Sequence, residues 1–118
     1  MIIEKMVETA VKALDSKKAV DIKVIKIDDL TTLADYFIIC NGTSTTQIRA
    51  LADECEFKLE EAGFKLLHRE GKDSGNWILL DYKDIVIHIY NRETREHYDL
   101  ERFWADGKEI DITGLLGE

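Results

Sequence analysis

The chain of 118 residues has the length of one domain that can bury an apolar core without disulfides or bound metals. Its 24 acidic and 16 basic residues give a formal net charge of −8 at pH 7, which argues against binding DNA or RNA through a basic surface. The same charge favours a basic protein partner, because complementary potentials attract and select partners. We therefore expect a single domain over residues 1–118.

Neither the cysteines nor the apolar runs indicate export or a membrane. Cys40 and Cys55 are too few for a disulfide framework and fall in apolar stretches, as buried thiols of a reducing compartment do. No window approaches the ~20 apolar residues of a membrane span, and the first residues lack the apolar stretch of a signal peptide. We expect a cytoplasmic protein that does not contact membranes.

The first third of the chain predicts one helix and two strands. Apolar residues recur every three or four positions over residues 2–16, which is typical of an amphipathic helix. Residues 21–27 alternate between apolar side chains and lysine and predict a strand with one partly exposed face. Residues 35–40 are almost continuously apolar, which indicates a central strand.

Turn and cap signals frame a second helix. After the Asn-Gly turn at 41–42, Ser44 and Gln47 form a capping-box pattern, in which each side chain satisfies a backbone N–H at the helix start. Gly63 ends this helix. Residues 64–68 then predict a third strand.

A polar loop over 70–76 leads into two apolar runs, 77–82 and 85–90, which predict an antiparallel hairpin around the turn at 83–84. Alternate side chains of a strand point to opposite faces of the sheet. One set is almost wholly apolar and should face the helices: Ile78, Leu80, Tyr82, Ile85, Ile87 and Ile89. The other set carries polar groups and should form a sheet face with limited cover: Trp77, Leu79, Asp81, Val86, His88 and Tyr90.

A short helix is expected over 94–104, and residues 110–112 could add a brief extended tail. Helices that alternate with strands in this order predict an α/β domain, with a mixed sheet of about five strands packed against helices.

The sequence offers little for catalysis. Residues 43–45 lie between a strand and a helix, where phosphates bind, but the lysine of a Walker motif and the glycines of a dinucleotide fingerprint are missing. A nucleotidyltransferase needs carboxylates on the next strand to hold two divalent cations, and residues 64–68 contain none. His88 and Asp81 share a predicted face, but no Ser or Cys nucleophile lies in the strands beside them, so we interpret them as a polar pair of a binding surface. We expect no catalytic residue, no cofactor and no metal.

Five blocks of sequence carry a family resemblance: ADYFII at 34–39, NGTS at 41–44, GNWILLDY at 75–82, IVIHIY at 85–90 and YDLERFW at 98–104. With these blocks in this order, the chain resembles the ribosomal silencing factor (Iojap) family over roughly residues 3–112. The resemblance implies an α/β fold that is nucleotidyltransferase-like but without catalytic carboxylates, and often a homodimer. It also implies binding to large-subunit ribosomal protein fourteen on the large ribosomal subunit. The resemblance further implies that a factor bound to this ribosomal protein sterically blocks association with the small subunit and represses translation when nutrients are scarce. One departure is Lys83, where the family often has glycine.

On this basis we expect a partner-binding surface of rings and carboxylates. Its residues are Asp35, Tyr36, Trp77, Leu79, Asp81, His88, Tyr98, Asp99, Glu101 and Trp104. Trp77 should be the main anchor, since a few aromatic side chains dominate most interfaces, and the carboxylates should add association rate and selectivity. Trp104 either joins this interface or closes the core.

Two other functions stay open at this point. A ribosome-assembly factor would use the same contact with the large subunit. A residual nucleotide-binding or nucleotidyltransferase enzyme would use the turn at 42–44.

Overall fold

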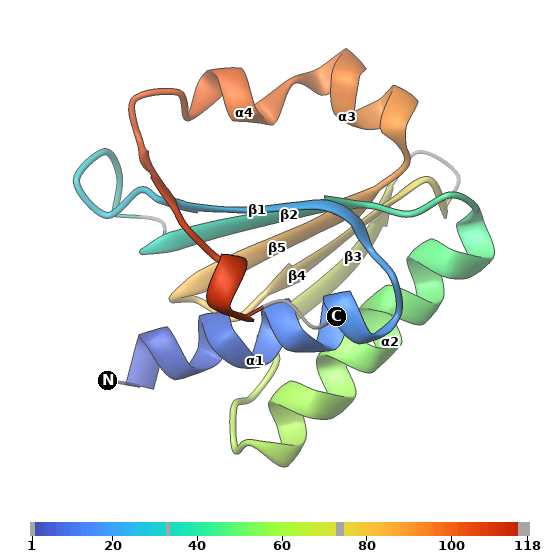
Figure 1. The fold of residues 1–118 in the computed structure, drawn as a ribbon, viewed down its shortest axis with the longest axis horizontal. Coiled ribbons are helices and arrows are strands. Elements are labelled where there is room, and N and C mark those ends of the chain that lie inside the picture. Colours follow the sequence, from blue (N-terminus) through green and yellow to red (C-terminus); the bar gives the residue numbers. More distant parts are fainter. Residues whose placement is uncertain (1, 33, 73–74, 116–118) are drawn as a thin grey trace.

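The computed structural model describes residues 2–32, 34–72 and 75–115, and in this part of the chain a six-stranded sheet carries helices on both faces (Figure 1). The elements are α1 (Ile2–Ser16), β1 (Val20–Lys26), β2 (Tyr36–Asn41), α2 (Thr45–Glu61), β3 (His68–Lys72), β4 (Trp77–Asp81), β5 (Ile85–Tyr90), α3 (Arg92–Tyr98), α4 (Leu100–Phe103) and β6 (Lys108–Ile110). α1 and α2 lie on one face of the sheet, and α3 and α4 lie over the other. None of the described helices is both long and apolar enough to cross a membrane.

The strand order is β3-β4-β5-β2-β1-β6. β2 lies in the middle, parallel to β5 and antiparallel to β1, and all six of its residues are buried, as expected of a continuously apolar strand. The other neighbouring strands pair antiparallel, so the sheet is mixed and the expected fold class is confirmed. β6 is the strand beyond the five expected, and it begins two residues before the predicted tail.

The main core lies between the sheet and the α1–α2 layer. α1 spans the predicted residues 2–16, and both free cysteines are buried in this core. The six hairpin residues that were expected to face the helices all belong to it: Ile78, Leu80, Tyr82, Ile85, Ile87 and Ile89. The alternation of side chains along the hairpin therefore assigned its two faces correctly.

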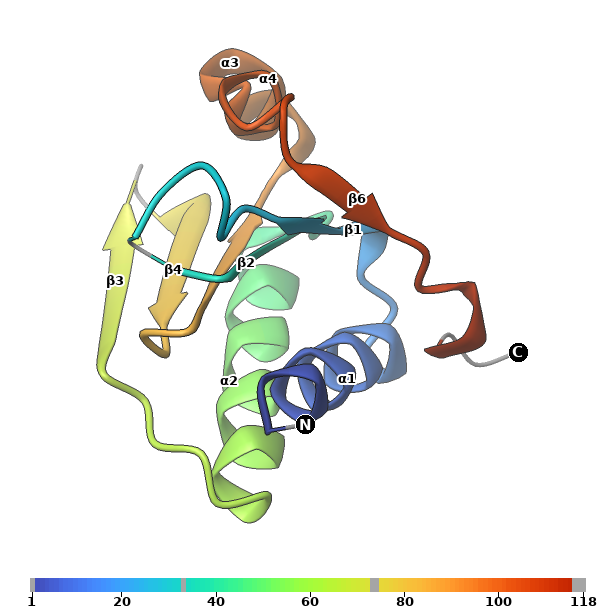
Figure 2. The same cartoon turned by 90° about the vertical axis from the view of Figure 1, so that its left-hand side faces the viewer.

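A smaller core lies on the other face, beneath α3 and α4. Its buried members are Ile25, Ile27, Ala34, Phe37, Ile39, Trp77 and Tyr90, with Val86, Leu100 and Trp104 packed against them. This face is therefore covered more than the sequence predicted. The cover is partial, because β3 and the end of β4 extend away from the α3–α4 layer (Figure 2).

The single helix expected over 94–104 is in fact two helices. The side chain of Asn91 caps α3 by accepting a hydrogen bond of 2.7 Å from the backbone N–H of Thr94. The helix ends before Asp99, which is in the left-handed region at φ 49°. Asp tolerates this region better than most residues, and the resulting corner lets Tyr98 and Leu100 both pack toward the sheet.

The strand predicted at 64–68 was wrong, since β3 occupies His68–Lys72. Phe64 and Leu66 instead pack as partly buried side chains against the main core, and the backbone N–H of Phe64 closes the end of α2 through Leu59 O. Packing against the main core thus accounts for Phe64 and Leu66, whereas Leu67 is exposed and the polar segment that follows pairs with β4 at the sheet edge.

The capping signal before α2 is confirmed in one of its two bonds. Ser44 Oγ accepts a hydrogen bond of 3.1 Å from the backbone N–H of Gln47. The Gln47 side chain does not reach back to Ser44, and its Oε1 accepts from the backbone N–H of Thr43 at 2.6 Å. Its Nε2 donates to the carbonyls of Lys17 and Lys18, which ties the start of α2 to the segment after α1.

Candidate protein-docking surface

Aromatic rings form a continuous row on the second face of the sheet. Phe37 lies 4.5 Å from His88 and 6.1 Å from Trp104, measured between ring centroids. Trp77 lies 5.5 Å from His88 and 4.8 Å from Tyr98. All four pairs are tilted at distances typical of favourable ring contacts. The row joins β2, β4 and β5 to the α3–α4 layer.

Trp77 and His88 lie inside this row rather than at the surface, with exposed fractions of 7% and 5%. Trp77 Nε1 donates a hydrogen bond of 2.8 Å to His88 Nδ1. The expectation that these two side chains meet a partner directly is therefore corrected, because α3–α4 closes over them. The strand register also places Leu79 opposite His88 and Asp81 opposite Val86.

At the margin of the α3–α4 cover, this face becomes partly exposed. We define the docking strip as five residues that share this face: Glu70, Leu79, Asp81, Val86 and Tyr98. Tyr98 is 48% exposed although its ring rests on Trp77. Leu79 is half-buried and belongs to neither core, and the side chain of Glu70 is 48% exposed. The strip thus combines apolar side chains with two carboxylates.

Asp81 also has a local structural role. Its Oδ1 accepts a hydrogen bond of 2.8 Å from the backbone N–H of Lys83 and so holds the turn between β4 and β5. A substitution of Asp81 therefore alters the hairpin as well as the charge of the strip.

Three of the other expected residues lie outside the strip. Tyr36 is 8% exposed and packs in the main core on the opposite face, where burial raises the pKa of its hydroxyl. Asp35 is half-buried at the start of β2, and its backbone N–H bonds to Asp84 O. Trp104 is half-buried and packs against the smaller core, so of the two alternatives the structure favours core closure.

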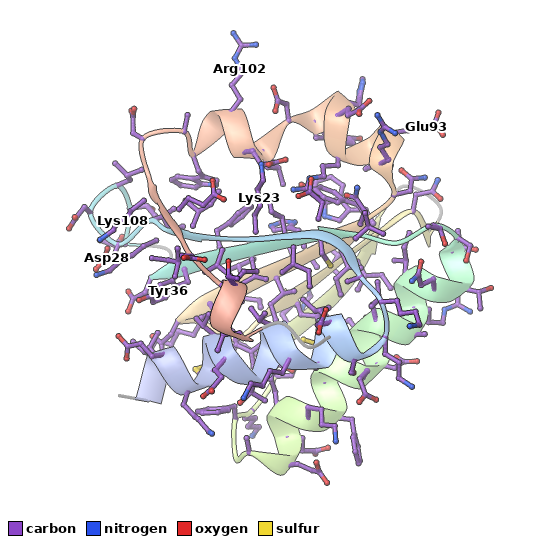
Figure 3. All side chains as sticks on the ribbon, in the orientation of Figure 1. Lys23, Asp28, Tyr36, Glu93, Arg102 and Lys108 are labelled. Carbon is purple, nitrogen blue, oxygen red and sulfur yellow. The ribbon has the colours of Figure 1, made fainter. Side chains whose placement is uncertain are left out.

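Asp99 and Glu101 flank the corner between α3 and α4. Asp99 is exposed there. Glu101 accepts a hydrogen bond of 2.8 Å from Arg95 Nε and pairs with Lys23 Nζ at 3.0 Å. Figure 3 shows Lys23 rising from β1 toward this layer, whereas Arg102 points away from the molecule. Glu101 is therefore paired with Arg95 and Lys23 of the same chain, and the exposed Asp99 is the carboxylate more available to a partner.

Sequence reasoning missed Arg95, which is only 5% exposed. Its Nη1 donates to the backbone carbonyl of Asp21 at 2.8 Å and to Asn41 Oδ1 at 2.9 Å. Burial acts to lower the pKa of Arg95, but the bond to Glu101 and the nearby carboxylates outweigh it and hold the pKa above its usual value. Arg95 precedes Tyr98 by three residues and so lies on the same face of the helix, which was the available signal that it belongs near the expected surface.

The described residues contain no group of three or more His, Cys, Asp or Glu side chains placed to hold a metal ion. Burial raises the pKa of the Cys40 thiol to about 12 and also raises that of Cys55. Neither thiol is thus primed as a nucleophile.

Comparisons with known proteins agree with this architecture. The family model described as "Ribosomal silencing factor during starvation" matches residues 2–118. Ribosomal silencing factor RsfS of Bacillus subtilis is 34% identical over 109 residues, which is 92% of each chain, and that of Haemophilus influenzae is 37% identical over 85% of this chain and 98% of its own. A crystal structure of a Chromobacterium violaceum protein superposes with a TM-score of 0.86 at 34% identity, covering 96% of this chain and 93% of that one. The mouse protein named mitochondrial assembly of ribosomal large subunit protein 1 is 34% identical over 84% of this chain and 45% of its own length. The chain therefore belongs to the ribosomal silencing factor family.

Proposed function

We propose that this protein is a non-enzymatic translation repressor of the cytoplasm. It binds the large ribosomal subunit through large-subunit ribosomal protein fourteen and sterically blocks association with the small subunit. The observation that carries the proposal is the docking strip, in which the exposed Tyr98 of α3 and the half-buried Leu79 of β4 accompany the carboxylates of Glu70 and Asp81. Aromatic and apolar anchors of this kind supply most of the affinity at interfaces.

Charge supports a basic partner. The chain carries a formal net charge of −8, and the strip itself contains Glu70 and Asp81. Opposite potentials raise the association rate and suppress wrong partners, and the effect weakens as salt rises. The protein measures 33 × 31 × 30 Å. Bound on the face of the large subunit that meets the small subunit, a protein of about this size would keep the two subunits apart.

The experiment is co-sedimentation with purified large subunits at low salt. Tyr98→Ala and Leu79→Arg should each weaken binding by about tenfold or more, as losses at interface anchors do. Phe57→Ala is the matched control, because Phe57 is 53% exposed on α2, in the layer on the opposite face. Two folded strip variants that bind like the wild type would remove the strip from the proposal.

Blocking of subunit joining needs its own measurement. Light scattering should show that the wild-type protein slows the association of mature large and small subunits, and that Tyr98→Ala does not. If the wild type binds mature large subunits without slowing association, steric repression is excluded.

An assembly role is the second candidate, and the name of the mouse relative favours it. The same contact would then act on immature large subunits. Depletion of the protein should in that case accumulate large-subunit precursors during growth, a result that steric repression alone does not produce.

We also propose a homodimer in the absence of ribosomes, as the family resemblance implies. Sedimentation velocity at micromolar concentration decides between the mass of one chain and that of two.

A further inference from the structure

Arg95 connects four elements of the fold through one buried guanidinium. It projects from α3, bonds to Asp21 O at the start of β1 and to Asn41 Oδ1 at the end of β2, and pairs with Glu101 of α4. Glu101 in turn pairs with Lys23 of β1. The flat, forked arrangement of guanidinium N–H groups is what allows one side chain to serve these acceptors together.

These bonds enclose the corner between α3 and α4. Arg95 lies before the left-handed Asp99 and Glu101 lies after it, so their hydrogen bond of 2.8 Å fixes the angle between the two short helices. α3 has seven residues and α4 has four. Helices this short are not stable alone, so their position depends on their attachments to the sheet.

Tyr98 is the residue of the docking strip that lies beside this junction. It is the last residue of α3 and lies one helical turn after Arg95. Its ring lies 4.8 Å from Trp77 while about half of it stays exposed. Ring contacts alone are weak and tolerate several geometries, whereas the guanidinium bonds have fixed directions.

We infer that Arg95 is a positioning residue of the docking surface: its bonds to β1, β2 and α4 hold α3 so that Tyr98 rests on Trp77 and presents its exposed edge to the ribosomal partner. This inference rests on the proposed function. Arg95 itself is buried, so it acts through Tyr98.

The test uses Arg95→Lys, which keeps the charge but loses the forked geometry. Arg92→Lys is the matched control, because Arg92 belongs to the same helix, its side chain is 82% exposed and it pairs with Glu96. Co-sedimentation with large subunits should show binding about tenfold weaker for Arg95→Lys, comparable to the loss of an interface anchor, and unchanged for Arg92→Lys.

A double-mutant comparison separates positioning from general destabilisation. In a Tyr98→Ala background, Arg95→Lys should weaken binding further by less than about twofold, because the side chain that it positions is gone. An equal loss in both backgrounds, or no loss in either, overturns the inference.

A spectroscopic measurement tests the position of Tyr98 without ribosomes. The ring protons of Tyr98 should be shifted by the Trp77 ring in the NMR spectrum of the wild type and of Arg92→Lys, and should move toward the values of a freely exposed tyrosine in Arg95→Lys. Unmoved Tyr98 resonances in folded Arg95→Lys overturn the inference. If the wild type binds no large subunits, the proposed function fails, and this measurement still decides what Arg95 does.

Discussion

Trp77 Nε1 donates a hydrogen bond of 2.8 Å to His88 Nδ1 between neighbouring strands, and both side chains are buried beneath α3. The bond requires that Nδ1 carry no proton, so it fixes which nitrogen of the imidazole accepts. The ring of Trp77 is also in contact with the ring of the exposed Tyr98, so this hydrogen bond supports the docking strip from the buried side.

Trp77→Phe removes this donor while keeping an aromatic ring. We expect the free energy of unfolding to fall by about 1–3 kcal/mol, because a buried acceptor loses its donor. Urea unfolding measures this. In a His88→Leu background the same substitution should cost clearly less, since the acceptor is already absent. Equal costs in both backgrounds would show that the bond contributes nothing beyond packing.

The same burial affects the choice of binding variants. Trp77→Ala deletes a large core side chain and is expected to cost about 3–5 kcal/mol of stability. A loss of ribosome binding by that variant would not distinguish a broken contact from a loosened α3–α4 layer. Tyr98→Ala reduces this ambiguity, because Tyr98 is about half exposed and the variant leaves the Trp77 side chain in place.

Strand faces could be predicted from the sequence because alternation is a local property of each strand. Leu79 and Asp81 fall on the same face for this reason, and the register confirms their neighbours. Whether another layer covers that face depends on where later residues pack, and no periodicity encodes this. For that reason the sequence did not predict that Tyr98 packs on Trp77 and helps to bury it.

The misplaced third strand shows a different limit. Apolar residues at 64, 66 and 67 satisfied a strand pattern, but Phe64 and Leu66 pack against the main core in an irregular segment, Leu67 is exposed, and His68 begins the true edge strand. Because edge strands are often polar, β3 gave little signal. Its Glu70 was consequently missing from the expected surface.

Tyr90 carries a buried hydroxyl that has no hydrogen-bond partner among the described residues. Burial raises the pKa of this hydroxyl above its usual value. Tyr90→Phe removes an unsatisfied polar group without changing the ring, so we expect the protein to become more stable by about 1 kcal/mol. Urea unfolding should show a higher midpoint, and Tyr98→Phe, at a half-exposed ring, should leave the midpoint unchanged. A lower midpoint for Tyr90→Phe would reveal a partner for this hydroxyl.

Lys83 occupies the hairpin turn with φ 73°, a region that glycine enters without strain. The family resemblance already indicated glycine at this position. Lys83→Gly should stabilise the protein by about 0.5–1 kcal/mol, since the relief of strain exceeds the extra entropy of the unfolded chain. Lys83→Ala keeps a Cβ and should give no such gain. If alanine stabilises as much as glycine, the backbone conformation is not the cause.

Gly107 lies against β1 just before β6. A Cβ there would come 2.6 Å from Ile25 Cγ2 and 2.9 Å from Lys26 O, of which the second is backbone and cannot rotate away. Gly107→Ala should therefore cost about 1–3 kcal/mol, as overpacking does. Gly114→Ala is the matched control, because its Cβ would meet nothing within 4 Å. Thermal unfolding should show a lower midpoint for the first variant alone.

Glu101 links folding stability to pH through Arg95. The hydrogen bond from Arg95 holds the pKa of Glu101 below its ordinary value of 4.5, against the opposing effect of burial and with help from Lys23. A carboxyl whose pKa is lowered by folding stabilises the protein fully above the pKa of the unfolded chain, and this contribution disappears as the pH falls through the folded pKa.

Glu101→Gln removes the titrating group but keeps its size. At pH 7 the variant should be less stable than the wild type by about 1–2 kcal/mol, because a charge-assisted hydrogen bond becomes a neutral one. As the pH falls from 6 to 3, the wild type should lose stability more steeply, and the two stabilities should converge as the pH passes below the lowered pKa of Glu101. Urea unfolding at each pH measures both curves. Parallel curves over this range would mean that Glu101 keeps its ordinary pKa in the folded protein and that the Arg95 junction contributes no charge-dependent stability.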